Sequence, residues 1–151
     1  SDAHHITAPH PKGDGVKVVM RNCLNDGKIK TNEVDAINTH GTSTPLGDVA
    51  ELKAISNVFG KHALNININS TKSMTGHMLG ASGAIEAISV ILSIQNKIVP
   101  PTINHKNIDE NIDQNLNLTL NTAQNREINI AMSNTFGFGG HNACLLFKKT
   151  D

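Results

Sequence analysis

The sequence predicts a layered α/β domain built around a mixed β-sheet. Segments with apolar residues at helical spacing alternate with short β-like segments, in the order helix, strand, helix, strand, helix, loop, strand, turn, strand. This alternation is typical of strands covered by helices, and the short glycine turn before the last strand favours an antiparallel pair. No internal repeat or linker divides the chain, so one domain is expected over residues 1–151.

A first helix is predicted over residues 14–26, with Gly27 as its stop. Its apolar face is formed by residues at helical spacing: Val16, Val19, Met20, Cys23 and Leu24. On this face Cys23 is interpreted as a small buried hydrophobe rather than a nucleophile.

A second helix is predicted from Thr44 to about Phe59, ended by Gly60. Thr44 offers a hydroxyl that can cap the helix, and Pro45 suits the first helical position. The residues expected to face the core again recur at helical spacing: Val49, Leu52, Ile55 and Phe59.

A third helix is predicted over about residues 81–96, after the glycine-rich loop 71–83. It is apolar nearly all round, so we expect it to be buried. Glu86 is its only charged residue, and a buried carboxylate requires a partner. Lys72 is the predicted partner; the alternative is that Glu86 lies on a narrow exposed stripe.

Strands are predicted where short apolar segments are bounded by turn residues. Residues 64–70 alternate apolar and polar residues, and 128–134 is apolar enough to be buried. The polar segment 104–125 is expected to be a loop. The full set of predicted strands is 34–38, 64–70, 128–134 and 142–149, with a possible short strand at 116–120.

Composition excludes several functions. The 13 Lys and Arg balance the 13 Asp and Glu, and aromatics make up only 3% of the chain, which argues against nucleic-acid binding. No stretch approaches the roughly 20 apolar residues of a membrane span. The start resembles no signal peptide and lacks Met, which suggests a fragment or an excised domain.

Neither a disulfide nor a metal site is predicted. The two cysteines lie far apart in the sequence without a CxxC pattern, which favours a reducing, cytoplasmic setting. The eight histidines include no HExxH motif and no Cys/His pair at finger spacing.

Polar clusters follow three predicted strands, at residues 39–44, 70–77 and 134–140. Ligands of open α/β sheets bind at this edge, so the clusters are expected to converge. His40 and His77 lie in two of them. A loop hydrogen bond is the simpler interpretation of each histidine alone. Two neutral imidazoles together can donate to a thioester oxygen and stabilise an enolate.

The glycine turn at residues 137–140 precedes a strand, whereas a phosphate-binding loop normally precedes a helix. It is therefore predicted to be a mobile turn beside the site. Such a turn can gate access and can point a backbone N–H at an oxyanion.

The chain resembles the C-terminal half of the type I/II β-ketoacyl-acyl-carrier-protein synthases of the thiolase superfamily, type II most of all. The resemblance rests on NTHGTSTPLGD, STKSMTGHMLGA, VPPTIN and SNTFGFGGHN. It implies one half of a thiolase-like fold, a layered α/β/α unit with a mixed five-stranded sheet and the active site between two halves. The chain is then the C-terminal thiolase-like domain, and the N-terminal half with the nucleophilic cysteine is absent.

The resemblance implies an acyltransferase of fatty-acid biosynthesis. The reaction is the decarboxylative Claisen condensation of an acyl thioester with malonyl-acyl-carrier protein (malonyl-ACP), without a cofactor, on substrates carried by a phosphopantetheine arm. Implied partners are acyl carrier protein, the N-terminal half and, in the full-length protein, a second copy in a homodimer. The isolated chain is expected to be inactive in condensation. The alternative is a non-catalytic carrier-protein or pantetheine-binding fragment, or a decarboxylase-only relative.

Carried over by motif, His40 and His77 bind the malonyl thioester carbonyl and promote decarboxylation. Lys72 matches the active-site lysine and Glu86 its partner. The second histidine, within TGH at 75–77, indicates the Cys-His-His group.

The same resemblance implies substrate-binding residues. Thr42 and Thr44 match threonines that contact the pantetheine arm. Phe138 lies in the gating loop, where its backbone N–H shares the oxyanion hole and its ring screens the acyl pocket. Phe136 and Gly139 are assigned to substrate binding with it.

Overall fold

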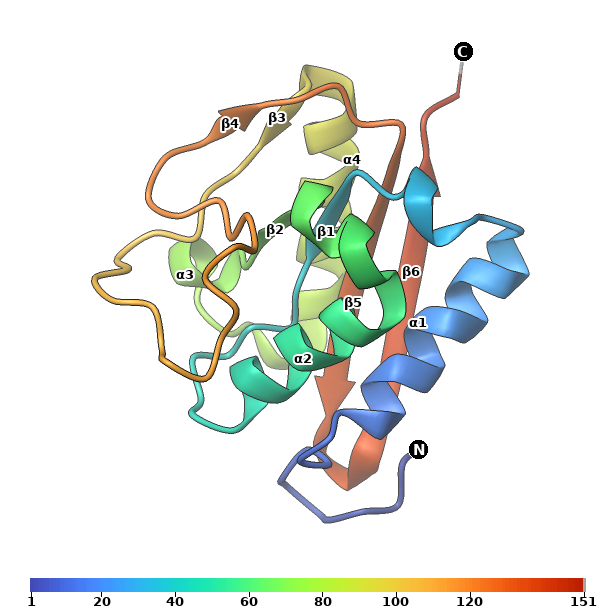
Figure 1. Ribbon diagram of the computed structural model, residues 1–151, viewed down its shortest axis with the longest axis vertical. Coiled ribbons are helices and arrows are strands. Elements are labelled where there is room, and N and C mark those ends of the chain that lie inside the picture. The colour runs from blue at the N-terminus through green and yellow to red at the C-terminus, as the bar shows by residue number, and fades with distance from the viewer. Residues whose placement is uncertain (151) are drawn as a thin grey trace.

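A mixed β-sheet forms the centre of the computed structural model, which describes residues 1–150 (Figure 1). Within this range the main sheet has the strand order β2-β1-β5-β6. Its strands are β1 (Ala36–Asn38), β2 (Asn67–Asn69), β5 (Ile130–Gly137) and β6 (His141–Lys148). Strand β1 runs parallel to β2 and β5, and β6 runs antiparallel to β5. The predicted mixed sheet and the C-terminal antiparallel pair are confirmed.

Helices cover both faces of the sheet. In Figure 1, α1 (Asp14–Gly27) and α2 (Gly47–Phe59) lie in front of it, and α4 (Ser82–Asn96) lies behind it. A short helix, α3 (Lys72–Thr75), follows β2. The three layers confirm the predicted α/β/α class.

Two buried clusters hold the layers together because successive strand residues point to opposite faces. Ile37 and Met132 pack into the larger cluster with residues of α1 and α2. Ala36 and Ala131 pack into the smaller cluster with residues of α4 such as Val90.

The ends of two helices differ from the predictions. Gly27 is the last residue of α1, and Lys28 takes the left-handed conformation with φ 53°. Helix α2 begins at Gly47 rather than Thr44. The reason lies in the preceding turn: Ser43 has φ 59°, and its N–H donates to Oδ1 of Asp48 at 3.2 Å. Gly60 ends α2, as predicted.

The strand predicted at 64–70 is shorter and more buried than expected. Residues Gly60–Asn65 form a 3-10 helix, so only Asn67–Asn69 pair. Two polar positions of the alternating pattern, Asn67 and Asn69, are buried, and other side chains satisfy the amide of Asn67. The Asn67 amide donates to Thr119 Oγ1 at 3.1 Å and to Gln124 Oε1 at 2.7 Å.

The fifth strand of the main sheet does not form within residues 1–150. Segment 116–120 contributes only an isolated bridge between Thr102 and Leu120. Thr119 takes φ 48°, which breaks an extended run. A separate small pair joins β3 (Ile98–Val99) to β4 (Gln124–Asn125). The main sheet of the described chain therefore has four strands, where five were predicted.

Helix α4 is not buried all round, contrary to the prediction. Ile88 and Leu92 are 53% and 50% exposed, because the sheet covers only one side of the helix. Glu86 is on the buried side. Although α4 is apolar, none of the helices in residues 1–150 is both long and apolar enough to cross a bilayer.

Candidate active site

The loops that follow β1, β2 and β5 converge at one edge of the sheet, as predicted. Ser70, after β2, donates its hydroxyl to the Gly41 carbonyl at 2.9 Å. The His40 ring lies 5.7 Å from the His77 ring and 5.5 Å from the Phe136 ring, measured between centroids. Residues from three separate segments therefore line one site.

His40 is a neutral imidazole at neutral pH. Burial, the largest cause, together with the charges of Lys72 and His77 lowers its pKa from 6.5 to about 4. Its Nδ1 is buried and has no hydrogen-bond partner within residues 1–150. A neutral ring of this kind can donate from one nitrogen without bringing a positive charge to the site.

Glu51, which sequence reasoning missed, holds the backbone of the His40 loop. Its carboxylate accepts the N–H of His40 at 3.0 Å, the N–H of Gly41 at 3.1 Å and the amide of Asn134 at 3.1 Å. Burial raises its pKa to about 7, even though these three donors act in the opposite direction. The sequence offered one indication that Glu51 is buried: it lies four residues before Ile55, on the core-facing side of the predicted helix.

Replacing Glu51 with alanine is expected to lower the free energy of unfolding by about 2–4 kcal/mol, because buried N–H donors lose their acceptor. Urea denaturation measures the loss, with exposed Glu110→Ala as the control.

In the parent, protonated Glu51 stabilises the fold fully below pH 4.5, and this contribution disappears as pH rises through about 7. Glu51→Gln should flatten that slope. Equal stability of the Glu51→Ala and Glu110→Ala variants would contradict the assignment.

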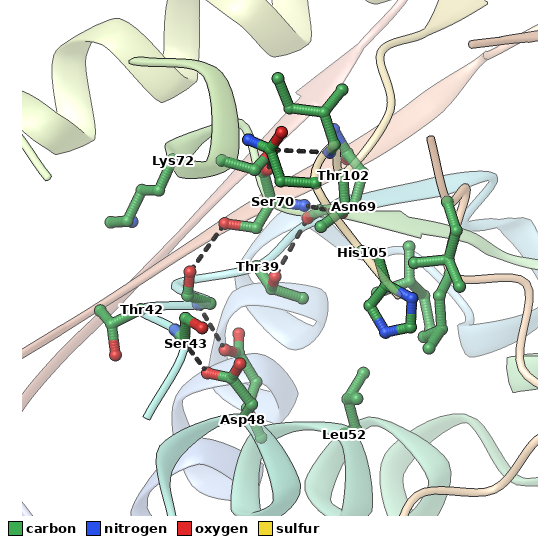
Figure 2. A pocket seen from close by; sticks show the side chains of 18 of the residues that line it. Thr39, Thr42, Ser43, Asp48, Leu52, Asn69, Ser70, Lys72, Thr102 and His105 are labelled. Carbon is green, nitrogen blue, oxygen red and sulfur yellow. Dashed lines mark hydrogen bonds between the residues drawn. The ribbon is translucent and has the colours of Figure 1, made fainter. Parts of the chain in front are cut away.

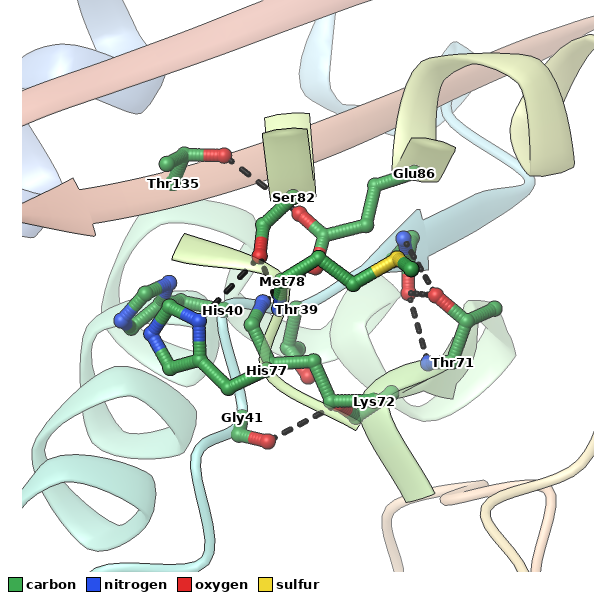
Figure 3. A network of polar contacts seen from close by, with 12 residues as sticks. Thr39, His40, Gly41, Thr71, Lys72, His77, Met78, Ser82, Glu86 and Thr135 are labelled. Carbon is green, nitrogen blue, oxygen red and sulfur yellow. Dashed lines mark hydrogen bonds and ion pairs between the residues drawn. The ribbon is translucent and has the colours of Figure 1, made fainter. Parts of the chain in front are cut away.

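Lys72 and Glu86 form the buried ion pair that the sequence predicted (Figure 3). Lys72, at the start of α3, places Nζ against Oε1 of Glu86. Glu86 is only 1% exposed, so the alternative of an exposed stripe is wrong. Thr135, on β5, donates its hydroxyl to the other carboxylate oxygen at 3.5 Å. The pair joins α3 to α4 directly beside the two histidines.

His77 lies on the exposed loop after α3. Its Nδ1 is 3.1 Å from the N–H of Leu79 and 3.2 Å from the hydroxyl of Ser82 (Figure 3). Sequence reasoning named His77 and missed Ser82, whose contact depends on a turn that no spacing rule predicts.

A cavity of about 640 Å³ brings most of the predicted substrate-binding residues together with both histidines. Thr42 and Thr44 line it, and their hydroxyls are 3.3 Å apart. Phe136 and the 75% exposed Phe138 line its other side. The N-terminal segment 5–9 also lines the cavity, a contribution that the sequence did not reveal.

A second cavity of about 390 Å³ adjoins the first (Figure 2). Gly41, Thr42 and His77 line both cavities. Asp48 lies on its wall, where burial raises the pKa of the carboxyl. The space on both sides of the His40 loop is therefore open.

The glycine turn 137–140 is bonded to the N-terminal segment. The N–H of Gly139 donates to the Ile6 carbonyl at 2.6 Å, and the N–H of Asp2 donates to the Gly140 carbonyl at 3.0 Å. Gly139 and Gly140 have φ values of 79° and 72°, a left-handed conformation that glycine adopts without the steric cost of a Cβ atom. The predicted gating role of this turn stays a prediction.

The two cysteines lie next to each other although they are far apart in the sequence. Cys23 on α1 and Cys144 on β6 are both half-buried at the edge of the larger core cluster, which agrees with a packing role for Cys23. A hydrogen bond from the Cys144 thiol lowers the pKa of Cys23. Neither cysteine lines the two cavities, and no group of three or more metal-ligating side chains occurs within residues 1–150.

Two imidazoles that lie edge to face on the wall of a cavity, beside a buried ammonium group, can stabilise negative charge on a carbonyl oxygen. Each ring can donate a hydrogen bond from a ring nitrogen, and preorganised donors of this kind stabilise charge that develops on an oxygen. The site is therefore suited to a reaction that passes through an enolate or an oxyanion.

Comparison with known proteins agrees with this geometry. Residues 1–106 match the family model of the beta-ketoacyl synthase C-terminal domain. Over 148 residues, 98% of the chain, the sequence is 51% identical to the 3-oxoacyl-[acyl-carrier-protein] synthase 2 of Staphylococcus aureus (strain COL). The protein of the same name from Synechocystis is 49% identical over 148 residues. The match covers 35% of each relative, so the chain spans about a third of their length.

Solved structures show the same fold. A beta-ketoacyl synthase from Burkholderia phymatum STM815 is 36% identical with a TM-score of 0.92, over 100% of this chain and 36% of that one. AntDE:AntF, a type II PKS acyl-carrier protein in complex with its ketosynthase, is 34% identical with a TM-score of 0.95, over 99% of this chain and 36% of that one.

Proposed function

This chain belongs to the beta-ketoacyl synthase family through its C-terminal domain, and from that premise we propose that it is the C-terminal catalytic half of a condensing enzyme. The reaction is the decarboxylative condensation of an acyl thioester with malonyl-ACP in fatty-acid chain elongation. The observation that carries the proposal is the pair of histidines, 5.7 Å apart on convergent loops beside the buried Lys72.

The histidines act on the malonyl thioester. With its carbonyl in the larger cavity, His40 and His77 donate hydrogen bonds to the thioester oxygen. The bond to the carboxylate carbon then breaks, carbon dioxide leaves, and the electron pair forms an enolate whose oxygen the two rings stabilise. The enolate carbon attacks the acyl thioester, and the cysteine thiolate that held the acyl chain leaves.

The nucleophilic cysteine comes from outside this chain. Cys23 on α1 and Cys144 on β6 pack at the edge of the larger core cluster, and neither lines the cavity. We assign the cysteine to an N-terminal half that packs against this domain. The exposed apolar residues of α4, Ile88 and Leu92, suit such a partner because a large exposed apolar surface marks an interface.

The remaining predicted roles fit the same proposal. Thr42 and Thr44 offer hydroxyls to the pantetheine arm at the wall of the cavity. Phe138, Phe136 and Gly139 belong to the strand and turn that border the acyl position. Acyl carrier protein delivers the substrates, and the complete enzyme is a homodimer.

A second candidate is a carrier-protein or pantetheine-binding fragment, or a relative that only decarboxylates. It is favoured by a cavity that holds both histidines and is lined by no cysteine. Decarboxylation needs the oxyanion donors alone, whereas condensation also needs the thiol.

The test measures decarboxylation of malonyl-ACP and condensation by this chain alone and mixed with a separately made N-terminal half. We expect condensation only in the mixture, because the thiol and the histidines come from different halves. A mixture that stays inert while the chain binds carrier protein would favour the second candidate. The N-terminal half with its cysteine replaced by alanine is the control.

A further inference from the structure

We infer that Ser82 is a positioning residue that holds His77 in the tautomer that carries its proton on Nε2. The inference rests on the proposed function for its catalytic consequence, and on the hydrogen bonds around one ring nitrogen for its structural part. Ser82 is the first residue of α4, and only 3% of it is exposed.

The first bond decides the protonation of Nδ1. The backbone N–H of Leu79 lies 3.1 Å from His77 Nδ1, and a backbone N–H can only donate. Nδ1 therefore accepts, and in the neutral ring the proton lies on Nε2. The ring edge that bears Nε2 is then the donor available to the cavities that His77 lines.

The Ser82 hydroxyl adds a second donor to the same nitrogen. Its oxygen accepts the N–H of Met78 at 3.0 Å and lies 3.2 Å from His77 Nδ1 (Figure 3). Because Nδ1 accepts the Leu79 N–H and so carries no proton in the neutral ring, the hydroxyl of Ser82 is the donor in this contact. Leu79 and Ser82 thus both direct a donor at the single lone pair of Nδ1.

The arrangement ties an exposed loop to a rigid element. His77 is exposed on a loop with irregular backbone, including Leu79 at φ 51°. Ser82 is anchored in α4, a helix of 15 residues. Without this anchor only the Leu79 N–H holds Nδ1, so the ring rotates and exchanges tautomers more readily, and an unprotonated Nε2 would repel the oxygen that it should stabilise. No comparable hydrogen bond fixes the tautomer of His40, since its Nδ1 has no partner within residues 1–150.

The test uses Ser82→Ala and Ser82→Thr in the intact protein that contains this chain, labelled with ¹⁵N-histidine. In Ser82→Ala the Nδ1 resonance of His77 should shift and the population of the Nδ1–H tautomer should rise. The kcat for decarboxylation of malonyl-ACP should fall about threefold to tenfold, as for one neutral hydrogen bond, with little change in KM. Ser82→Thr keeps the hydroxyl and should restore both readouts.

Ser93→Ala is the matched control. Ser93 lies on the same helix and is also buried, but its hydroxyl donates to the Ser89 carbonyl of its own helix at 2.8 Å. If Ser82→Ala matches Ser93→Ala in the His77 resonance and in kcat, the inference is overturned. If the resonance responds in a protein without decarboxylase activity, the positioning role stands and the proposed function fails.

Discussion

Replacing His40 or His77 with alanine is expected to lower kcat for decarboxylation of malonyl-ACP by about 10²- to 10⁴-fold, which abolishes activity in a routine assay. The centroids of the two rings are 5.7 Å apart, so each variant removes one of two donors to the same developing oxyanion. The measurement is carbon dioxide release by the intact protein, or by the reconstituted halves, at saturating substrate.

His105→Ala is the control for the histidine variants. His105 lines the second cavity and does not line the first, so its removal should leave the rate nearly unchanged.

Because burial lowers the pKa of His40 to about 4, the contribution of its neutral ring should persist down to about pH 5 and disappear as pH falls through 4. A His40→Ala or His77→Ala protein with full activity would refute the catalytic assignment.

Replacing Lys72 with methionine is expected to lower the free energy of unfolding by about 3–5 kcal/mol. The variant leaves the Glu86 carboxylate buried without its cation, and breaking a buried pair from one side is strongly destabilising. Urea denaturation at neutral pH measures the effect. The double variant Lys72→Met/Glu86→Leu should recover much of the loss, because no charge then stays uncompensated.

The exposed pair between Lys97 and Glu127 provides the comparison. Lys97 Nζ and Glu127 Oε2 are 2.8 Å apart, but solvent screens both groups. The Lys97→Met variant should therefore change stability little. A Lys72→Met protein as stable as Lys97→Met, or a double variant no more stable than the single one, would show that burial of the pair does not matter. The catalytic rate of the double variant separates stability from chemistry, since it also lacks the cation beside His40.

The parts of the candidate site that depend on strand ends and on a buried charge could be predicted from the sequence. The clusters around His40 and His77 follow parallel strands, whose carboxyl ends share one edge of the sheet. Glu86 was conspicuous as the single charge in an apolar helix, and a buried charge needs a partner, which identified Lys72. Both inferences depend only on element type and on the free energy of burying charge.

The errors arose where the conformation of a single turn overrides the preference of a whole segment. Thr44 has the chemistry of a helix cap, yet Asp48 binds the Ser43 N–H and moves the helix start to Gly47. Segment 116–120 has the composition of a strand, but a left-handed Thr119 interrupts it.

Glu51 and Ser82 were missed for a related reason. Glu51 accepts the backbone N–H groups of His40 and Gly41, and Ser82 contacts the His77 ring. No residue pattern indicates where these loop groups will point.

By itself, the sequence determined the α/β class, the strand order along the chain, the two histidines and the buried Lys72–Glu86 pair. The class and the pair follow from apolar periodicity and from the free energy of burying a charge, which are local, and the two histidines follow from the polar clusters after the predicted strands and from the family resemblance. Only the tertiary structure decided the four-stranded sheet, the neutral state of His40, the anchoring of its loop by Glu51 and the contact of Ser82 with His77. Each of these depends on distances between groups from separate segments, and such distances are set only when the helices pack on the sheet.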